Sequence, residues 1–112
     1  MAVNIDVILS PAEFPALAQR DLDTTTCVVF DVLRATSSML TALYNGAEAI
    51  TPVSEIPEAL ALRARQPNIL LAGERKGLRI RKDLTGSVDF DFGNSPRDFT
   101  PEKVRGQIAQ GG

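Results

Sequence analysis

The sequence contains no histidine and only one cysteine, Cys27. Without histidine, this segment has no histidine-based catalytic triad, no histidine general base and no histidine ligand for zinc. A single cysteine cannot form an intrachain disulfide, and the first six residues lack the basic and apolar regions of a secretion signal. We therefore expect a reduced, cytoplasmic setting, with chemistry carried by carboxylates, hydroxyls, cations and backbone amides.

Long apolar runs and an excess of positive charge are also missing. No apolar stretch approaches the ~20 residues that cross a bilayer, and no basic amphipathic helix indicates binding to a membrane surface. The 14 acidic and 12 basic residues give a formal charge of -2, so the chain lacks the overall field that attracts nucleic acid. We expect neither a membrane nor a nucleic-acid partner, and any site for an anion must be local.

The composition is that of an ordinary folded domain, since 44% of the 112 residues are hydrophobic and 23% are charged. Alternating apolar residues predict a strand over residues 3–9, and a continuous apolar run predicts a central strand over residues 25–32, with Cys27 as an inert core residue. Two shorter strands are expected at residues 49–51 and 69–72. Capping residues and helical spacing predict three helices, within residues 10–20, 36–46 and 54–66.

This order of elements predicts an α/β fold. It implies right-handed crossovers and a mainly parallel sheet with helices on both faces, a three-layer α/β/α arrangement that is incomplete at the C-terminus. We expect one domain over residues 1–106 and an unstructured tail over residues 107–112, because the tail has almost no hydrophobic pattern. In open parallel sheets ligands bind beyond the carboxyl ends of the strands, so the residues that follow each strand are the candidates for function.

The first candidate segment follows the run at residues 25–32. Asp31 can hold Mg²⁺ or attack phosphorus, and Arg34 can bind a phosphate through two hydrogen bonds. Thr36, Ser37 and Ser38 lie where the start of a helix offers free amides to an anion. Equally, Asp31 and Arg34 can form a local ion pair, with Thr36 as an N-cap.

The second candidate segment follows Gly73, and five of the 12 basic residues fall within positions 75–82. This clustering predicts a local positive surface able to hold a doubly anionic substrate. Glu74 can act as a metal ligand or a general base, and Arg75 can bind the anion. The alternative is a solvated charged loop, while an RNA site is disfavoured because no aromatic residue is interleaved for base stacking.

The third candidate segment covers residues 89–96. Phe90 and Phe92 are expected to point inward from a strand, with the neighbouring acids, including Asp91, pointing outward. A tight turn follows, in which Asn94 and Ser95 either bind a ligand or bond the backbone of the turn.

Four short motifs in these segments, taken in order, resemble the 2-phosphosulfolactate phosphatase family. They are V-V-F-D-V-L-R-A-T at residues 28–36, N-G-A at 45–47, L-A-G-E-R at 71–75 and F-G-N-S-P at 92–96. Each motif alone is weak, whereas their order and separations together are specific. The resemblance covers residues 3–106.

The resemblance implies Mg²⁺-dependent hydrolysis of 2-phospho-3-sulfolactate to 3-sulfolactate and phosphate, a step in coenzyme M biosynthesis. Combined with the strand-end argument, it assigns catalytic roles to Asp31, Arg34 and Glu74, and metal binding to Asp31, Glu74 and Asp91. Substrate binding is assigned to the following residues: Thr36, Ser37, Arg75, Asn94 and Ser95.

The chain departs from the family at its end. Family members continue into another strand, a T-T-N-G-T motif and a second half of the sheet, whereas this sequence ends at Gly112. The alternative to an active phosphatase is therefore a truncated, non-catalytic domain that keeps an anion-binding fold. A partial sheet also leaves an unpaired edge, which favours self-association into a homo-oligomer.

Overall fold

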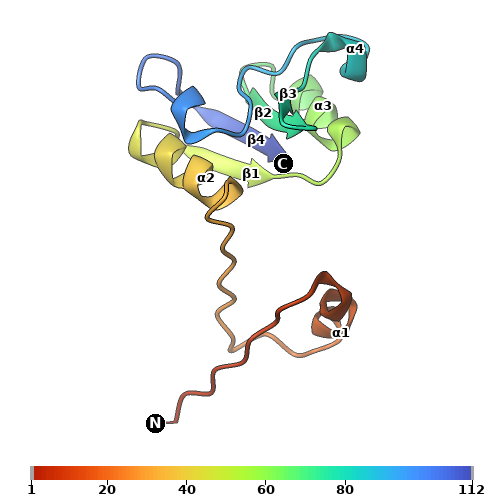
Figure 1. Ribbon diagram of the computed structural model, residues 1–112, viewed down its shortest axis with the longest axis vertical. Helices are drawn as coiled ribbons and strands as arrows, with labels where there is room; N and C mark the ends of the chain where they lie inside the picture. Colours follow the sequence, from red (N-terminus) through yellow and green to blue (C-terminus); the bar gives the residue numbers. More distant parts are fainter. Residues whose placement is uncertain (1, 112) are drawn as a thin grey trace.

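A computed structural model describes residues 2–111, and Met1 and Gly112, the outer ends of the predicted domain and tail, lie outside the described residues. The chain forms an α/β fold around a four-stranded sheet in the order β1-β4-β2-β3 (Figure 1). Strand β4 pairs in parallel with both β1 and β2, and β3 pairs antiparallel with β2. The strands are β1 (Ala49–Pro52), β2 (Leu70–Arg75), β3 (Leu78–Arg79) and β4 (Gln107–Gly111).

The three predicted helical regions are confirmed. The helices are α1 (Phe14–Ala18), α2 (Ala35–Tyr44), α3 (Ile56–Arg65) and the short α4 (Lys82–Thr85), with 3₁₀ turns η1 (Pro11–Glu13) and η2 (Pro96–Asp98). Ser10 caps η1 in a capping box with Glu13, as its sequence indicates, whereas α3 is capped by Glu55. None of the helices within residues 2–111 is long and apolar enough to cross a membrane.

The core consists of two clusters, because successive side chains of β2 and β4 point to opposite sides of the sheet. Leu70 and Ile108 pack with Ala42 of α2, whereas Leu71 and Ala109 pack with Ala59 of α3. Phe92 joins the first cluster and stacks on Phe99 with ring centroids 4.7 Å apart, and Phe90 joins the second. The expected burial of Phe90 and Phe92 is therefore confirmed, but the segment makes only an isolated bridge at Phe92 and not the expected strand, and the two rings lie in different clusters.

The expectation of an unstructured tail is wrong for the described residues 107–111, since they form β4, which lies between β1 and β2. The apolar segment Ile108-Ala109 is too short to stand out in the sequence, yet neighbours on both edges bury it completely. Strand β2 also continues through Gly73, where a strand break was expected. A side chain at Gly73 would collide with the backbone carbonyl of Gly111, so glycine allows these two chain segments to approach closely.

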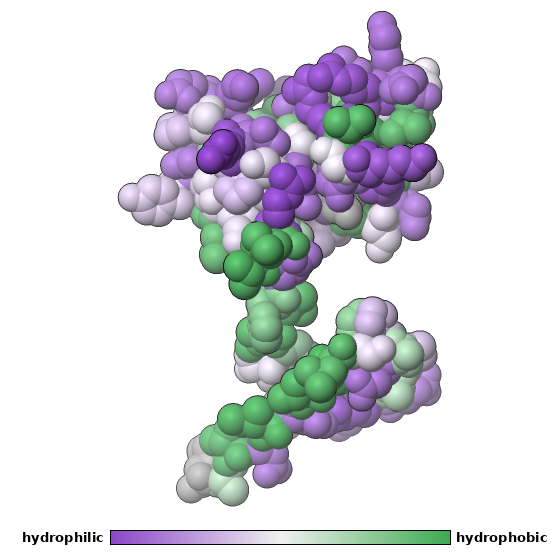
Figure 2. Space-filling model, viewed as in Figure 1, coloured by the Kyte–Doolittle hydropathy of each residue, from purple (hydrophilic) through white to green (hydrophobic). Residues whose placement is uncertain are grey.

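The predicted strands at residues 3–9 and 25–32 are also wrong, because no strand within residues 2–111 pairs with either segment. Val29 is 84% exposed and Phe30 is 77% exposed, and Cys27, expected in the core, is exposed as well. We refer to residues 2–34 as the arm and to residues 35–111 as the body. The arm leaves the body where α2 begins (Figure 1), and apolar surface gathers along it (Figure 2).

Candidate functional site

The first candidate segment forms a tight turn that leads into α2. The Asp31 amide donates to Thr36 Oγ1 (2.8 Å), the Thr36 amide donates to the Asp31 carbonyl (2.9 Å), and Ser37 Oγ donates to the Val32 carbonyl (2.6 Å). Both hydroxyls thus hold the turn against the helix. Within residues 2–111 the side chains of Asp31 and Arg34 form no ion pair with each other, and the guanidinium of Arg34 has no hydrogen-bond partner.

A buried polar network joins the start of α2 to the third candidate segment and to β4. Ser38 Oγ donates to the Asn94 carbonyl (2.7 Å), and Gln110 Nε2 donates to Asn94 Oδ1 (2.9 Å). Ser38 is fully buried, and Gln110 and Asn94 are only 2% and 7% exposed. Because Gln110 lies near the carboxyl end of the parallel strand β4, the network is at the edge where α/β sheets bind ligands.

We predicted roles for Asn94 and for Ser38 at the start of the helix, but missed Gln110 and the contacts that join these three residues. The contact between Ser38 and Asn94 joins residues 56 positions apart, and that between Gln110 and Asn94 joins residues 16 positions apart. The one available signal was a polar residue between the apolar Ile108-Ala109 and Gly111, which is the pattern of a strand end.

The second candidate segment is the turn between β2 and β3. Glu74 Oε2 accepts a hydrogen bond from the Gly77 amide (2.6 Å), and Arg75 NH1 donates to the Glu74 carbonyl (2.8 Å). Lys76 has φ 55°, the left-handed conformation that such a turn requires. The Glu74 carboxylate therefore stabilises this turn.

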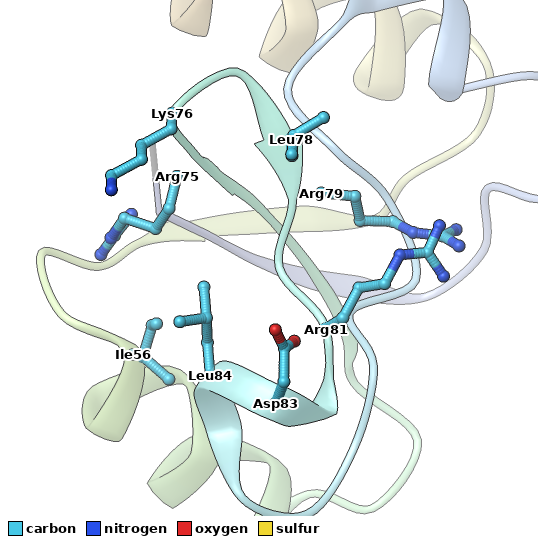
Figure 3. Close-up of a pocket in the computed structure, with 8 residues that line it drawn as sticks. All are labelled: Ile56, Arg75, Lys76, Leu78, Arg79, Arg81, Asp83 and Leu84. Carbon is cyan, nitrogen blue, oxygen red and sulfur yellow. The ribbon is translucent and has the colours of Figure 1, made fainter.

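The predicted basic cluster borders an open pocket of about 580 Å³ between the β2–β3 turn, α3 and α4 (Figure 3). Its apolar lining comes from Ile56, Leu78 and Leu84. Arg79 and Arg81 point away from Arg75 and Lys76, so the four cations surround an apolar floor and do not converge on one point.

Two further candidates have local partners. Ser95 Oγ accepts from the Arg97 amide (3.3 Å) at the start of η2, as expected if it bonds the turn. Asp91 Oδ2 accepts from Arg63 NH2 (2.7 Å) and from the Leu71 amide (2.8 Å). The Asp91 carboxylate thus fastens α3 and the loop to β2.

The candidate segments meet only in part. The first and third segments meet through the hydrogen bond from Ser38 to the Asn94 carbonyl, and the second and third meet through the Lys82 amide, which donates to Asp89 Oδ1 (2.7 Å). Within residues 2–111 no hydrogen bond or ion pair joins the side chain of Asp31 or Arg34 to that of Glu74. No group of three or more acidic, cysteine or histidine side chains in the described chain is arranged to hold a metal ion. The three expected Mg²⁺ ligands, Asp31, Glu74 and Asp91, therefore do not form one cluster within residues 2–111.

Comparisons with known proteins agree with the motifs. Residues 12–109 match the family model described as 2-phosphosulpholactate phosphatase. The chain is similar to proteins named probable 2-phosphosulfolactate phosphatase from Caldanaerobacter subterraneus subsp. tengcongensis (43% identity over 84% of this chain) and Clostridium tetani (39% identity over 94%). It spans 37% and 41% of the length of these two relatives.

Proposed function

Because the chain belongs to the 2-phosphosulfolactate phosphatase family, we propose that it takes part in the hydrolysis of 2-phospho-3-sulfolactate to 3-sulfolactate and phosphate. The observation that carries the proposal is the family match over residues 12–109. The hydrogen bond from Ser38 to Asn94 supports it, since it joins a residue just after the first family motif to a residue of the fourth, near the carboxyl end of the parallel strand β4. A cytoplasmic location, a role in coenzyme M biosynthesis and three-layer α/β/α packing are parts of the same proposal.

We assign the phosphate-binding role first to Arg34. Its guanidinium group has no hydrogen-bond partner within residues 2–111, and it lies at the start of α2, where the positive end of the helix dipole favours an anion. A guanidinium can bind two phosphoryl oxygens at once, which orients the ester as well as attracting it. Arg75, at the end of β2, is assigned to the sulfonate or carboxylate of the substrate.

Asp31 is assigned to the reacting phosphorus, either as nucleophile or as a ligand of Mg²⁺. Mg²⁺ is proposed as the cofactor, and when bound it supplies charge stabilisation at the phosphoryl oxygens. Since Asp31, Glu74 and Asp91 do not converge within the described chain, we assign no step to the ion.

The test is phosphate release from 2-phospho-3-sulfolactate, measured with and without Mg²⁺, by the wild-type protein and by Asp31→Asn. We expect this substitution to lower kcat by at least roughly 100-fold, because it removes the carboxylate that acts in the transition state. Asp23→Asn is the matched control, an exposed acid of the arm away from the family motifs. Full activity in Asp31→Asn removes Asp31 from the chemistry.

A second candidate function is a non-catalytic domain that binds an anion without turnover. It is favoured by one observation, that the proposed metal ligands are not assembled within residues 2–111. Under this alternative the 112-residue chain binds orthophosphate but releases none from the ester. Turnover by this chain at the rate of a longer family member would rule it out.

A further inference from the structure

We propose that Ser38 and Gln110 are positioning residues that orient the Asn94 carboxamide so that its Nδ2 group donates to a phosphoryl oxygen of the ligand. The inference rests on the proposed function and adds a neutral hydrogen-bond donor to the cations already assigned. It concerns three side chains from α2, the loop after Phe92 and β4, all buried at one edge of the sheet.

The hydrogen bonds leave Asn94 with one free group. Its main-chain carbonyl oxygen accepts a hydrogen bond from Ser38 Oγ at 2.7 Å, and its side-chain Oδ1 accepts one from Gln110 Nε2 at 2.9 Å. The Nδ2 group, which carries two hydrogens, has no acceptor within residues 2–111. Both oxygens of Asn94 therefore accept hydrogen bonds within the protein, and its Nδ2 donor is left for a ligand.

In the structure the Gln110 amide sets the orientation of the Asn94 carboxamide, because Gln110 Nε2 donates to Asn94 Oδ1. With Gln110 Nε2 kept as the donor, rotating the Asn94 amide by half a turn would place Asn94 Nδ2 against Gln110 Nε2, two donors with no acceptor between them. Gln110 Oε1 is the only fully enclosed side-chain nitrogen or oxygen that lacks a partner in the described chain. Asn94 Nδ2 also lacks a partner within residues 2–111 and is not among the fully enclosed atoms, so it keeps some contact with solvent.

The unpaired oxygen of Gln110 argues against a purely stabilising role. Burying an acceptor without a donor opposes folding, and an apolar side chain of similar length would avoid that cost. The one hydrogen bond that the Gln110 side chain makes is the bond that orients Asn94. Burial of Gln110 opposes folding, and its side-chain hydrogen bond is made to the Asn94 carboxamide, so the residue fits a positioning role.

The experiment follows the side-chain amide signals of Asn94 by nuclear magnetic resonance while the 112-residue chain is titrated with inorganic orthophosphate. We expect saturable shifts in the wild type and affinity about tenfold weaker in Gln110→Met, a loss of the size of one hydrogen bond. Ser38→Ala, which removes the other anchor, should weaken binding in the same direction. Gln107→Met is the matched control, since it makes the same change at the exposed first residue of β4.

A double-mutant cycle separates positioning from structural effects. If Gln110 acts through Asn94, the double variant Gln110→Met/Asn94→Ala binds orthophosphate as Asn94→Ala does. Additive losses, unchanged affinity in both Gln110→Met and Ser38→Ala, or unshifted Asn94 signals would overturn the inference. If the wild-type protein hydrolyses the ester but its Asn94 signals do not shift, the positioning inference is rejected and the phosphatase proposal is retained. If the Asn94 signals shift but the wild-type protein shows no turnover, the positioning inference is retained and the phosphatase proposal is rejected.

Discussion

The body and the arm each contain an apolar run, but the run in the body is buried and the run in the arm is exposed. In the body, Ile108-Ala109 is fully buried because β4 lies between two partner strands. In the arm, Val29 and Phe30 belong to a longer and more strongly apolar run, yet they are mostly exposed. The difference shows that an apolar pattern expresses a tendency to be buried, whereas a strand also needs a neighbour that accepts its backbone hydrogen bonds.

The candidate site divides along the same line. Ser38, Asn94 and Gln110 belong to the body and are buried and hydrogen-bonded to one another. Asp31 belongs to the arm and is exposed, although the turn that carries it is bonded to the start of α2. The buried part of the candidate site is therefore the Asn94 network, whereas Asp31 and Arg34, which are proposed to act on the phosphate, lie in the arm.

Removing one buried aromatic ring should produce the largest difference between the two regions. Phe99 is fully buried and stacks on Phe92, so Phe99→Ala should lower the free energy of unfolding by about 3–5 kcal/mol. Phe30→Ala, the same change in the arm, should alter it by less than about 0.5 kcal/mol. Urea unfolding measures both, and a large loss in Phe30→Ala would show that the arm is packed.

Breaking an ion pair in the body and one in the arm should give a smaller difference in the free energy of unfolding. Asp91→Asn removes the charge that pairs with Arg63 across 2.7 Å, and we expect a loss of about 1–2 kcal/mol because this carboxylate also accepts from a backbone amide. Asp6→Asn breaks the arm pair with Arg20, whose side chains are 69% and 49% exposed, and should cost less than about 0.5 kcal/mol. Equal losses of unfolding free energy in Asp91→Asn and Asp6→Asn, measured by urea unfolding, would contradict the distinction between body and arm.

The smallest expected effect is a pH dependence that arises in the body. The pKa of Glu102 is lowered from its ordinary value of 4.5, first by a hydrogen bond from its own backbone amide and then by one from Thr100. Since the pKa is lower in the folded state, the carboxylate stabilises the fold above about pH 4.5, and this contribution is lost as the pH falls through the folded-state pKa. Glu102→Gln should therefore flatten the acid side of a stability–pH curve, and an unchanged slope would exclude this source.

Elements fixed by local pattern could be predicted from the sequence. Helices α2 and α3 follow from helical spacing and their end residues, and the burial of Phe90 and Phe92 follows from their apolar character. Strand β4 and the exposed arm could not be predicted, because both depend on which strands are present as partners. Gln110 was missed for the same reason, since it lies on β4, whereas its partner Asn94 belongs to a recognisable motif in a loop.

Amide hydrogen exchange compares the two regions most directly. If the body is folded around β4 and the arm is unpaired, amides at residues 71–73 and 108–110 exchange slowly, while those at residues 28–33 exchange at close to the rate of an unfolded chain. Protection at residues 28–33 equal to that at residues 108–110 would contradict this division and restore the central strand that the apolar run predicts.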